Sequence, residues 1–334
     1  MLRKRIGIDL GTANSLVWLA GRGMMLNEPT VVAVTMEDNR VVAVGNEAKE
    51  MLGRTPGNIM ASRPMRDGVI ADYRVTEAML SYFIQKVCGR VVLFKPEVMI
   101  CVPAGVTQVE RRAVLDATLS AGAKVAYLID EPLAAAIGAK IPIAAASGSM
   151  IIDVGGGSTE AAVISLGGVV VHKSVRVAGN KVDEAVASFL KRNHNLLVGE
   201  TTAEEVKLRI GSAIVLPTEE TMEVKGRDTV TGLPRAVTVS STEMTEAIRP
   251  TLLQIVGAAK GVLEETPPEL ASDIIDKGIV MSGGTSLLNN LDKLFTEITG
   301  VPCHVAENPL LCVAQGTGIA LENIDLYKRS IKRH

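Results

Sequence analysis

One motif occurs twice in this chain of 334 residues and constrains its fold more than any other feature. Ile6–Thr12 reads IGIDLGT, and Ile151–Thr159 reads IIDVGGGST. Each copy is a short apolar strand that ends in an aspartate and turns through glycine into hydroxyl side chains. Glycine allows a tight turn whose backbone N–H groups can approach phosphate oxygens, while the aspartate can face the accompanying Mg²⁺.

The two aspartates, Asp9 and Asp153, stand 144 positions apart. A single Asp-x-Gly match is most often only a turn. Two matched copies at this spacing instead predict two similar domains, each of which offers one phosphate-binding hairpin to a nucleotide held between them.

The composition is that of a large globular chain, since 47% of the residues are hydrophobic and the formal net charge is −2. This charge balance supplies no basic surface, so we expect no nucleic-acid partner. The four cysteines form no C-x-x-C pair, which argues against structural zinc and disulfides and favours a reducing cytoplasm. Asp9 interrupts the apolar run of a signal peptide, and no stretch approaches the roughly 18 apolar residues of a membrane span, so any membrane contact is expected to be peripheral.

Apolar strands alternate with helical patterns through most of the chain, which predicts an α/β fold. Two of the expected helices cover 108–121, with Arg111 and Arg112 on the solvent side, and 286–299. The segment 140–149 carries no charge after its lysine and is rich in alanine, serine and proline, so we expect the domain junction there.

Two further segments carry candidate chemistry. Ile279–Leu288 is a third strand that passes through a Gly-Gly pair into an expected helix, either as a plain tight turn or as a place where a flat ring or a sugar approaches the backbone. Asp130 and Pro132 suit the start of a helix after a strand, and capping alone accounts for them. Glu131 between them could in addition orient, or accept a proton from, a water that attacks a γ-phosphate.

Glu204 and Lys207 lie three positions apart on an expected helix. Such pairs are usually solvated ion pairs, although they can also belong to a site.

An apolar patch at 91–94 lies between Arg90 and Lys95 in an expected surface connection. Because a surface loop is normally polar, the patch is either tucked into the core or meets an apolar partner, and the flanking cations would suit an anionic bilayer.

The order of these motifs resembles the actin/Hsp70/sugar-kinase ATPase superfamily. The likeness rests on DLGTAN at 9–14, EPLAAAIG at 131–138, DVGGGSTE at 153–160 and SGG at 282–284. Within the superfamily, residues 1 to about 325 resemble the MreB-type bacterial actins, through NEPT at 27–30, RPMRDGVIAD at 63–72, TGLPR at 231–235 and TPPEL at 266–270.

The resemblance implies an α/β, actin-like ATPase fold in which two RNase H-like domains enclose a cleft for ATP or ADP with Mg²⁺. Domain I would comprise 1–140 plus about 310–334, with a small inserted subdomain at about 31–64. Domain II would comprise 141–309, with an inserted subdomain at about 180–243. The family further implies slow ATP hydrolysis coupled to homopolymer filaments. These filaments would bind peripherally to the inner face of the cytoplasmic membrane and, with wall-synthesis and elongation proteins as partners, guide rod shape.

The resemblance also assigns roles by motif position. Catalysis would involve Glu131, Asp153 and Thr159, and Asp9 and Asp153 would hold Mg²⁺ through water. Nucleotide contacts would come from Asp9, Gly11, Thr12, Ala13, Asn14 and Ser15 in the first hairpin, Gly155, Gly156 and Gly157 in the second, Glu204 and Lys207 on the sugar side, and Gly283, Gly284, Thr285 and Ser286 on the adenosine side. Leu93 and Phe94 would insert into the membrane.

Four positions depart from the family pattern. Thr285 stands where a third glycine is common, Ser15 and Ser158 where threonine is frequent, and Asp130 where glutamate is frequent. The first departure is expected to alter nucleotide affinity, because a side chain enters a place that is usually empty.

Two soluble ATPases are the alternative interpretations. A Hsp70-like chaperone shares the Asp-Leu-Gly-Thr hairpin, but the chain ends soon after the ATPase elements. A sugar kinase would need a carboxylate base beside a sugar pocket, for which Glu131 is the only candidate that the sequence offers. Sedimentation with ATP–Mg²⁺ separates a polymer from both.

Overall fold

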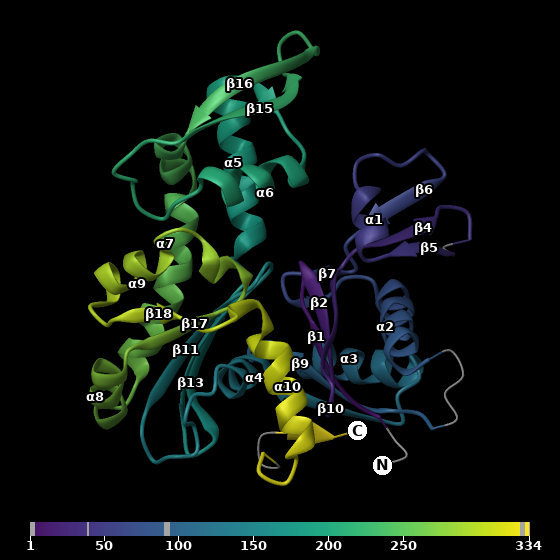
Figure 1. Cartoon of the computed structure of the whole chain (residues 1–334), viewed down its shortest axis with the longest axis vertical. Coiled ribbons are helices and arrows are strands. Elements are labelled where there is room, and N and C mark those ends of the chain that lie inside the picture. Colours follow the sequence, from purple (N-terminus) through teal and green to yellow (C-terminus); the bar gives the residue numbers. More distant parts are fainter. Residues whose placement is uncertain (1–3, 39, 90–93, 328–330, 334) are drawn as a thin grey trace.

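The computed structural model describes residues 4–38, 40–89, 94–327 and 331–333. Two halves lie side by side, each built on one large sheet, and a smaller lobe extends from each half toward the top of the view (Figure 1).

The first large sheet has six strands. In spatial order they are β19 (Ile331–Arg333), β10 (Val125–Asp130), β9 (Glu97–Val102), β1 (Arg5–Leu10), β2 (Asn14–Leu19) and β3 (Gly23–Pro29). Strands β1, β2 and β3 pair antiparallel through tight connections, while β1, β9 and β10 run parallel. The parallel strands are buried almost throughout, which explains their apolar runs.

The second large sheet repeats this plan with five strands. In spatial order they are β13 (Gly168–Val175), β12 (Thr159–Ser165), β11 (Ser149–Val154), β17 (Ile279–Ser282) and β18 (Cys303–Val305). Again three antiparallel strands, β11 to β13, are followed by parallel neighbours. The duplicated sequence motif therefore corresponds to a duplicated sheet topology, as predicted.

Helices cover the outer faces of both sheets. Beside the first lie α2 (Tyr73–Cys88) and α3 (Gln108–Ser120), and beside the second lie α7 (Ser241–Glu265), α8 (Pro268–Lys277) and α9 (Leu291–Thr299). The helices α3 and α7 begin with capping boxes, Thr107 with Glu110 and Ser240 with Glu243.

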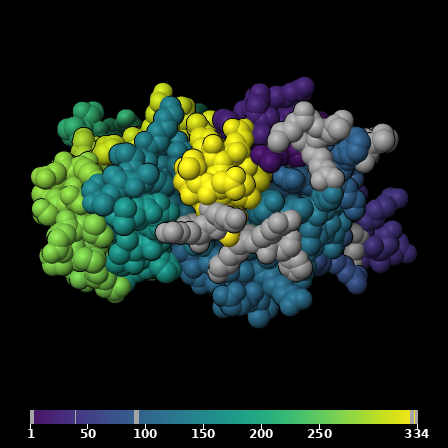
Figure 2. Space-filling model, turned by 90° about the horizontal axis from the view of Figure 1, so that it is seen from below, coloured from purple at the N-terminus to yellow at the C-terminus, as the bar shows by residue number. Residues whose placement is uncertain are grey.

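Two helices, α4 (Glu131–Gly138) and α10 (Cys312–Glu322), pack against each other between the sheets, and their side chains join residues of both sheets in one core. A Cβ at Gly138 would overlap the carbonyl oxygen of Cys312, and one at Gly316 would overlap that of Ala134. Only glycine permits this approach of the two backbones. Seen from below, the C-terminal residues (yellow) fill the seam between the teal and the blue parts of the molecule (Figure 2).

The two lobes are separate small folds. The lobe of the first half holds β4 (Val32–Thr35), β5 (Val41–Val44), α1 (Asn46–Glu50) and β6 (Ile59–Ser62), followed by the short hairpin β7 (Met65–Arg66) and β8 (Val69–Ile70). The lobe of the second half holds α5 (Gly179–His194), β14 (Leu196–Leu197), α6 (Glu200–Ile210), β15 (Thr221–Asp228) and β16 (Pro234–Ser240). We propose the domain and subdomain boundaries given above, because each lobe has a sheet of its own.

Two local predictions were wrong. The expected helix over 286–299 is a 3₁₀ turn, η1 (Gly284–Leu287), followed by α9, because Asn290 adopts a left-handed conformation and Asn289 bridges to Ser212. Arg111 is 8% exposed instead of facing solvent, whereas Arg112 does face it.

Candidate functional site

The two predicted hairpin turns meet in space. They connect β1 with β2 and β11 with β12. A Cβ on Gly157 would clash with Thr12, and one on Gly156 would lie 2.5 Å from Cβ of Ala13. The contact between the two turns thus requires glycine in the second one, which accounts for the residue type seen in the sequence.

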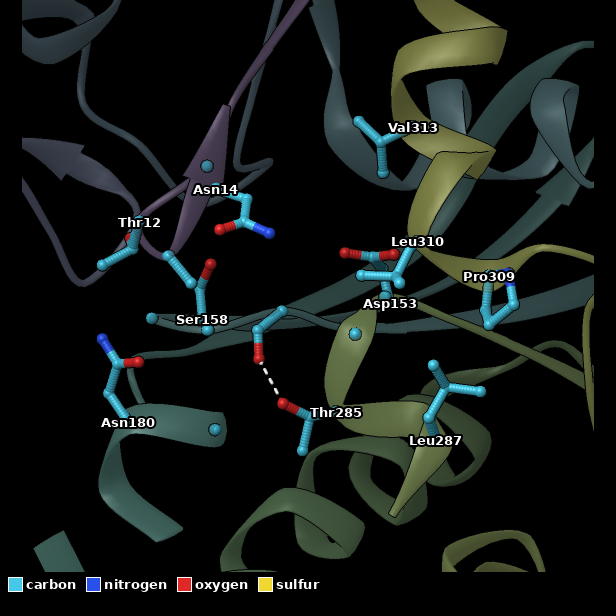
Figure 3. A pocket seen from close by; sticks show the side chains of 18 of the residues that line it. Thr12, Asn14, Asp153, Ser158, Asn180, Thr285, Leu287, Pro309, Leu310 and Val313 are labelled. Atoms are coloured by element: carbon cyan, nitrogen blue, oxygen red, sulfur yellow. Dashed lines mark hydrogen bonds between the residues drawn. The ribbon is translucent and has the colours of Figure 1, made fainter. Parts of the chain in front are cut away.

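A cavity of about 320 Å³ opens where the two turns meet. Its walls come from both hairpins, from α5 and α6, from the η1 turn, and from the 3₁₀ turn η2 (Pro309–Leu311) with the start of α10 (Figure 3). Most of the predicted site residues line it: Asp9, Gly11, Thr12, Ala13, Asn14, Glu131, Asp153, Gly155, Gly156, Gly157, Glu204, Lys207, Gly283, Gly284 and Thr285. Leu287, Leu310 and Val313 give one side of the cavity an apolar surface.

The third glycine turn is locked to the second hairpin. Gly283 has φ 85°, and a Cβ there would overlap the backbone of Val154. The hydroxyl of Thr285 donates a hydrogen bond of 2.7 Å to the carbonyl of Gly155 (Figure 3). The side chain that replaces the expected third glycine therefore joins two walls of the cavity.

The N-terminus of α5 also faces the cavity, through Gly179 and Asn180. Sequence reasoning missed these residues and Asp183, one turn further on. A signal was available, because Ala178-Gly179-Asn180 follows a strand and opens a helix, as the glycine turns at the other walls follow strands. Free N–H groups at such a helix start favour an anionic ligand.

Three carboxyl groups crowd the deep end of the cavity. Burial raises the pKa of Asp9 to about 7, and the charge of Asp153 adds to this rise. Burial likewise raises the pKa of Asp153 to about 6, although Ser282 donates a hydrogen bond of 2.6 Å to it. The pKa of Glu131 lies well above its usual range because of burial and of the charges of Asp153 and Asp9. This cluster favours a cation, which would relieve the repulsion.

The carboxylates fit a magnesium ion that is held through water. Among the described residues, no group of three or more His, Cys, Asp and Glu side chains is arranged to hold a metal directly. Asp9 near the end of β1 and Asp153 near the end of β11 nevertheless both line the cavity and offer hard oxygen ligands. Mg²⁺ keeps several waters and commonly binds through one or two carboxylates together with substrate phosphates, so the donor set suits it.

Three predicted residues, Ser15, Thr159 and Ser286, do not line the cavity. Ser15 shares a hydrogen bond of 2.9 Å with Thr30, Thr159 donates to the carbonyl of Val177 at 2.7 Å, and Ser286 donates to that of Gly283 at 2.6 Å. All three are buried. Their hydroxyls stabilise the turns, and a contact with a ligand stays a prediction.

Ion pairs cross the mouth of the cavity between the two lobes. Arg63, which follows β6, lies 2.6 Å from Glu200 at the start of α6, and Lys49 of α1 lies 3.2 Å from Glu204. Lys207 pairs with Asp183 of α5 at 2.8 Å. Glu204 and Lys207 therefore pair with residues of α1 and α5 and not with each other. The local sequence around α6 does not predict these partners.

Of the two residues predicted to insert into the membrane, the structure describes only Phe94. Leu93 lies outside the described residues. Phe94 is 46% exposed, so its side chain is not part of a described core. Within the described ranges, no helix is both long and apolar enough to cross a membrane.

The repeated sheets, the inserted lobes and the cavity between the halves define the class: this is an actin-like ATPase fold. The sequence model of the "MreB/Mbl protein" family matches residues 3–329. The chain belongs to the MreB/Mbl family.

Curated relatives are similar over the whole length. The "Cell shape-determining protein MreB" of Escherichia coli K12 is 52% identical, and the match covers 98% of this chain and 96% of the relative. The "Cell shape-determining protein Mbl" of Bacillus cereus is 50% identical, and the match covers 99% of this chain and 100% of the relative.

Solved structures of actin-like proteins are similar to this chain over almost its whole length. MreB5 of Spiroplasma citri bound to AMPPNP superposes with a TM-score of 0.92 at 37% identity, over 98% of both chains. The MamK double helical filament matches with a TM-score of 0.81 at 23% identity, over 96% of this chain and 99% of that one, which supports the fold alone.

Proposed function

We propose that this chain is a bacterial actin that binds and hydrolyses ATP and assembles into filaments. The observation that carries the proposal is the cavity between the two glycine hairpins, with buried carboxyl groups at its deep end. The Spiroplasma citri relative has been solved with AMPPNP and with ADP, and family membership supports the filament.

The backbone N–H groups of both hairpins bind the phosphates, since glycine lets them approach the ligand closely. Glu204 and Lys207 contact the sugar, and the turn at 283–286 contacts the adenosine. The position of Glu204, Lys207, Gly283, Gly284 and Thr285 in the wall of the cavity supports this assignment. The apolar surface of Leu287, Leu310 and Val313 suits a flat base.

Hydrolysis depends on the deep end of the cavity. Asp9 and Asp153 would hold Mg²⁺, and the ion would neutralise charge on the phosphates. Glu131, which lines the cavity at the start of α4, orients the attacking water. Thr159 follows Ser158, which lines the cavity, and its own hydroxyl supports the second hairpin through the hydrogen bond to Val177, so its role beside the γ-phosphate stays a proposal from the family pattern alone.

The filament acts at the inner face of the cytoplasmic membrane. Leu93 and Phe94 anchor it peripherally to lipid, and the exposure of Phe94 supports this role. Its partners are further copies of itself and the proteins of wall synthesis and elongation, so that it guides rod shape. The MreB/Mbl family membership does not favour the chaperone and sugar-kinase alternatives.

Sedimentation with nucleotide tests the proposal. Purified protein should pellet with ATP–Mg²⁺ and stay in the supernatant with Asp153→Ala, because that variant loses part of the magnesium site. Calorimetry should show that Asp153→Ala has lost most of its affinity for ATP–Mg²⁺. Unchanged affinity in the folded variant would reject the site, and wild-type protein that binds ATP without pelleting would reject the filament.

A further inference from the structure

Arg111 of α3 is buried beside the residues that precede Glu131. Its guanidinium donates a hydrogen bond of 2.7 Å to Oδ1 of Asp130 and one of 3.2 Å to the carbonyl oxygen of Ala104. The residue is 8% exposed. A buried charge is strongly destabilising unless it is paired and hydrogen-bonded, so these two contacts account for its presence there.

The first contact holds the strand end that leads into Glu131. Asp130 is the last residue of β10 and occupies the N-cap position of α4, but its side chain makes no capping hydrogen bond. Asp130 therefore lies at the predicted N-cap position, but its side chain does not cap the helix. Its carboxylate faces Arg111 instead, at the cost of the capping bond that an N-cap aspartate normally makes.

The second contact reaches the other half of the molecule. The N–H of Ala104, whose carbonyl accepts from Arg111, donates a hydrogen bond of 3.1 Å to Oε2 of Glu160 on β12. Glu160 is the register partner of Asp153 on the neighbouring strand. A continuous chain of contacts thus runs from Asp130, through Arg111 and Ala104, to the strand pair that carries Asp153.

Both ends of this chain adjoin the cavity, since Glu131 follows Asp130 and Asp153 lies opposite Glu160. We propose that Arg111 is a positioning residue for ATP hydrolysis, which sets the Glu131 carboxylate relative to Asp153. The inference rests on the proposed ATPase function. A misplacement of about 1 Å at a reacting centre is enough to slow a reaction about a hundredfold.

The neighbouring arginine provides a matched control. Arg112 points to solvent and pairs with Asp116 of its own helix at 3.7 Å, with a side chain that is 75% exposed. Arg112→Gln changes the same charge on the same helix without touching the chain of contacts. A general effect of the charge on α3 would appear in both variants, whereas an effect of the buried contacts would appear only in Arg111→Gln, and the melting temperature separates lost stability from lost positioning.

Single-turnover hydrolysis at saturating ATP–Mg²⁺, together with ATP affinity from calorimetry, tests the proposal. We expect Arg111→Gln to slow hydrolysis at least tenfold with affinity within about twofold of wild type, and Arg112→Gln to match wild type in both. Arg111→Lys should hydrolyse ATP at a rate between those of wild type and Arg111→Gln, since lysine keeps the charge but cannot make both hydrogen bonds of the planar guanidinium.

Asp130→Asn probes the same pair with an isosteric change, so the test does not depend on the folding of Arg111→Gln. If the pair acts as a unit, the double variant should lose no more than Arg111→Gln alone. Normal hydrolysis in Asp130→Asn and Arg111→Gln overturns the inference while leaving the ATPase proposal intact. A lowered melting temperature of Arg111→Gln with an unchanged hydrolysis rate per bound ATP also overturns the inference. Wild-type protein that binds ATP without hydrolysing it rejects the ATPase proposal, and the inference with it.

Discussion

Asp9→Asn should stabilise the nucleotide-free protein while it weakens the binding of ATP–Mg²⁺. Asp9 is buried beside Asp153, and together burial and this charge raise its pKa from 3.8 to about 7. Asparagine has nearly the same shape and can still accept the thiol hydrogen bond that Cys101 donates to Oδ1 at 3.4 Å. The substitution therefore removes a buried charge without leaving a cavity.

The size of the effect follows from the shift in pKa. A folded-state pKa above the unfolded value means that the folded protein holds the proton more tightly, so the ionised group opposes folding at high pH. Below about pH 4 the group is protonated in both states and has no effect. Between pH 3.8 and about 7 the stability of the wild type falls, and above that range the loss is constant. At about 1.36 kcal/mol for each pKa unit, the loss at pH 8 approaches roughly 4 kcal/mol.

Thermal and urea unfolding at pH 8 and pH 4, without nucleotide or divalent cation, measure this difference. At pH 8 we expect Asp9→Asn to melt several degrees above wild type, and at pH 4 the two should coincide. The exposed Glu37→Gln serves as the control, with no difference at either pH. An Asp9→Asn protein that melts at or below wild type at pH 8, or that keeps its advantage at pH 4, would refute the reasoning.

Three further outcomes are expected. Glu131→Gln should bind ATP about normally but release phosphate about a hundredfold more slowly in single-turnover assays, because it acts mainly in the transition state; an unchanged rate would make it only a helix-start residue. Glu200→Arg should speed release of a fluorescent ATP analogue about two- to fivefold, since a partly exposed ion pair contributes about 0.5–1 kcal/mol. Arg63→Glu in addition should restore the rate, and Glu205→Arg, whose wild-type partner Arg209 lies on the same helix, is the control. Phe94→Ser should reduce co-sedimentation with anionic vesicles without lowering the melting temperature, whereas Val109→Ser, at another exposed apolar site, should not; undiminished vesicle binding would reject the anchor.

The hairpins show how far the sequence could be interpreted. The strands, their aspartates and their turns are local patterns, and their duplication predicted two repeated sheets that the structure confirms. Gly156 and Gly157 could be singled out because glycine lets a turn approach a phosphate closely. The structure adds that a Cβ on either residue would collide with the first turn. The helix expected over 286–299 failed for the opposite reason, since the bridge from Asn289 to a residue far away in the sequence interrupts it.

Arg111 and Arg112 illustrate why the rest of the site could not be predicted. Adjacent arginines have the same helix propensity but point about 100° apart around the helix. Arg111 falls on the face that Val114 and Thr118 bury, and Arg112 faces solvent. The difference arises because Asp130 and Ala104 are brought beside one of them by the packing of α3 on β10. The partner of a charge is a property of the assembled fold and leaves no mark in the local sequence.

By itself, the sequence determined the elements whose chemistry is local: apolar strands, glycine turns, the carboxylates at the strand ends, and the family to which they belong. The tertiary structure alone decided the environment of those groups. It brought Asp9, Asp153 and Glu131 close together and raised their pKa values by desolvation and, for Asp9 and Glu131, by neighbouring charge, and it joined Lys49 to Glu204 across the cavity. Turn chemistry and side-chain period act over a few residues, whereas desolvation and charge pairing depend on distances in space, which only the folded chain sets.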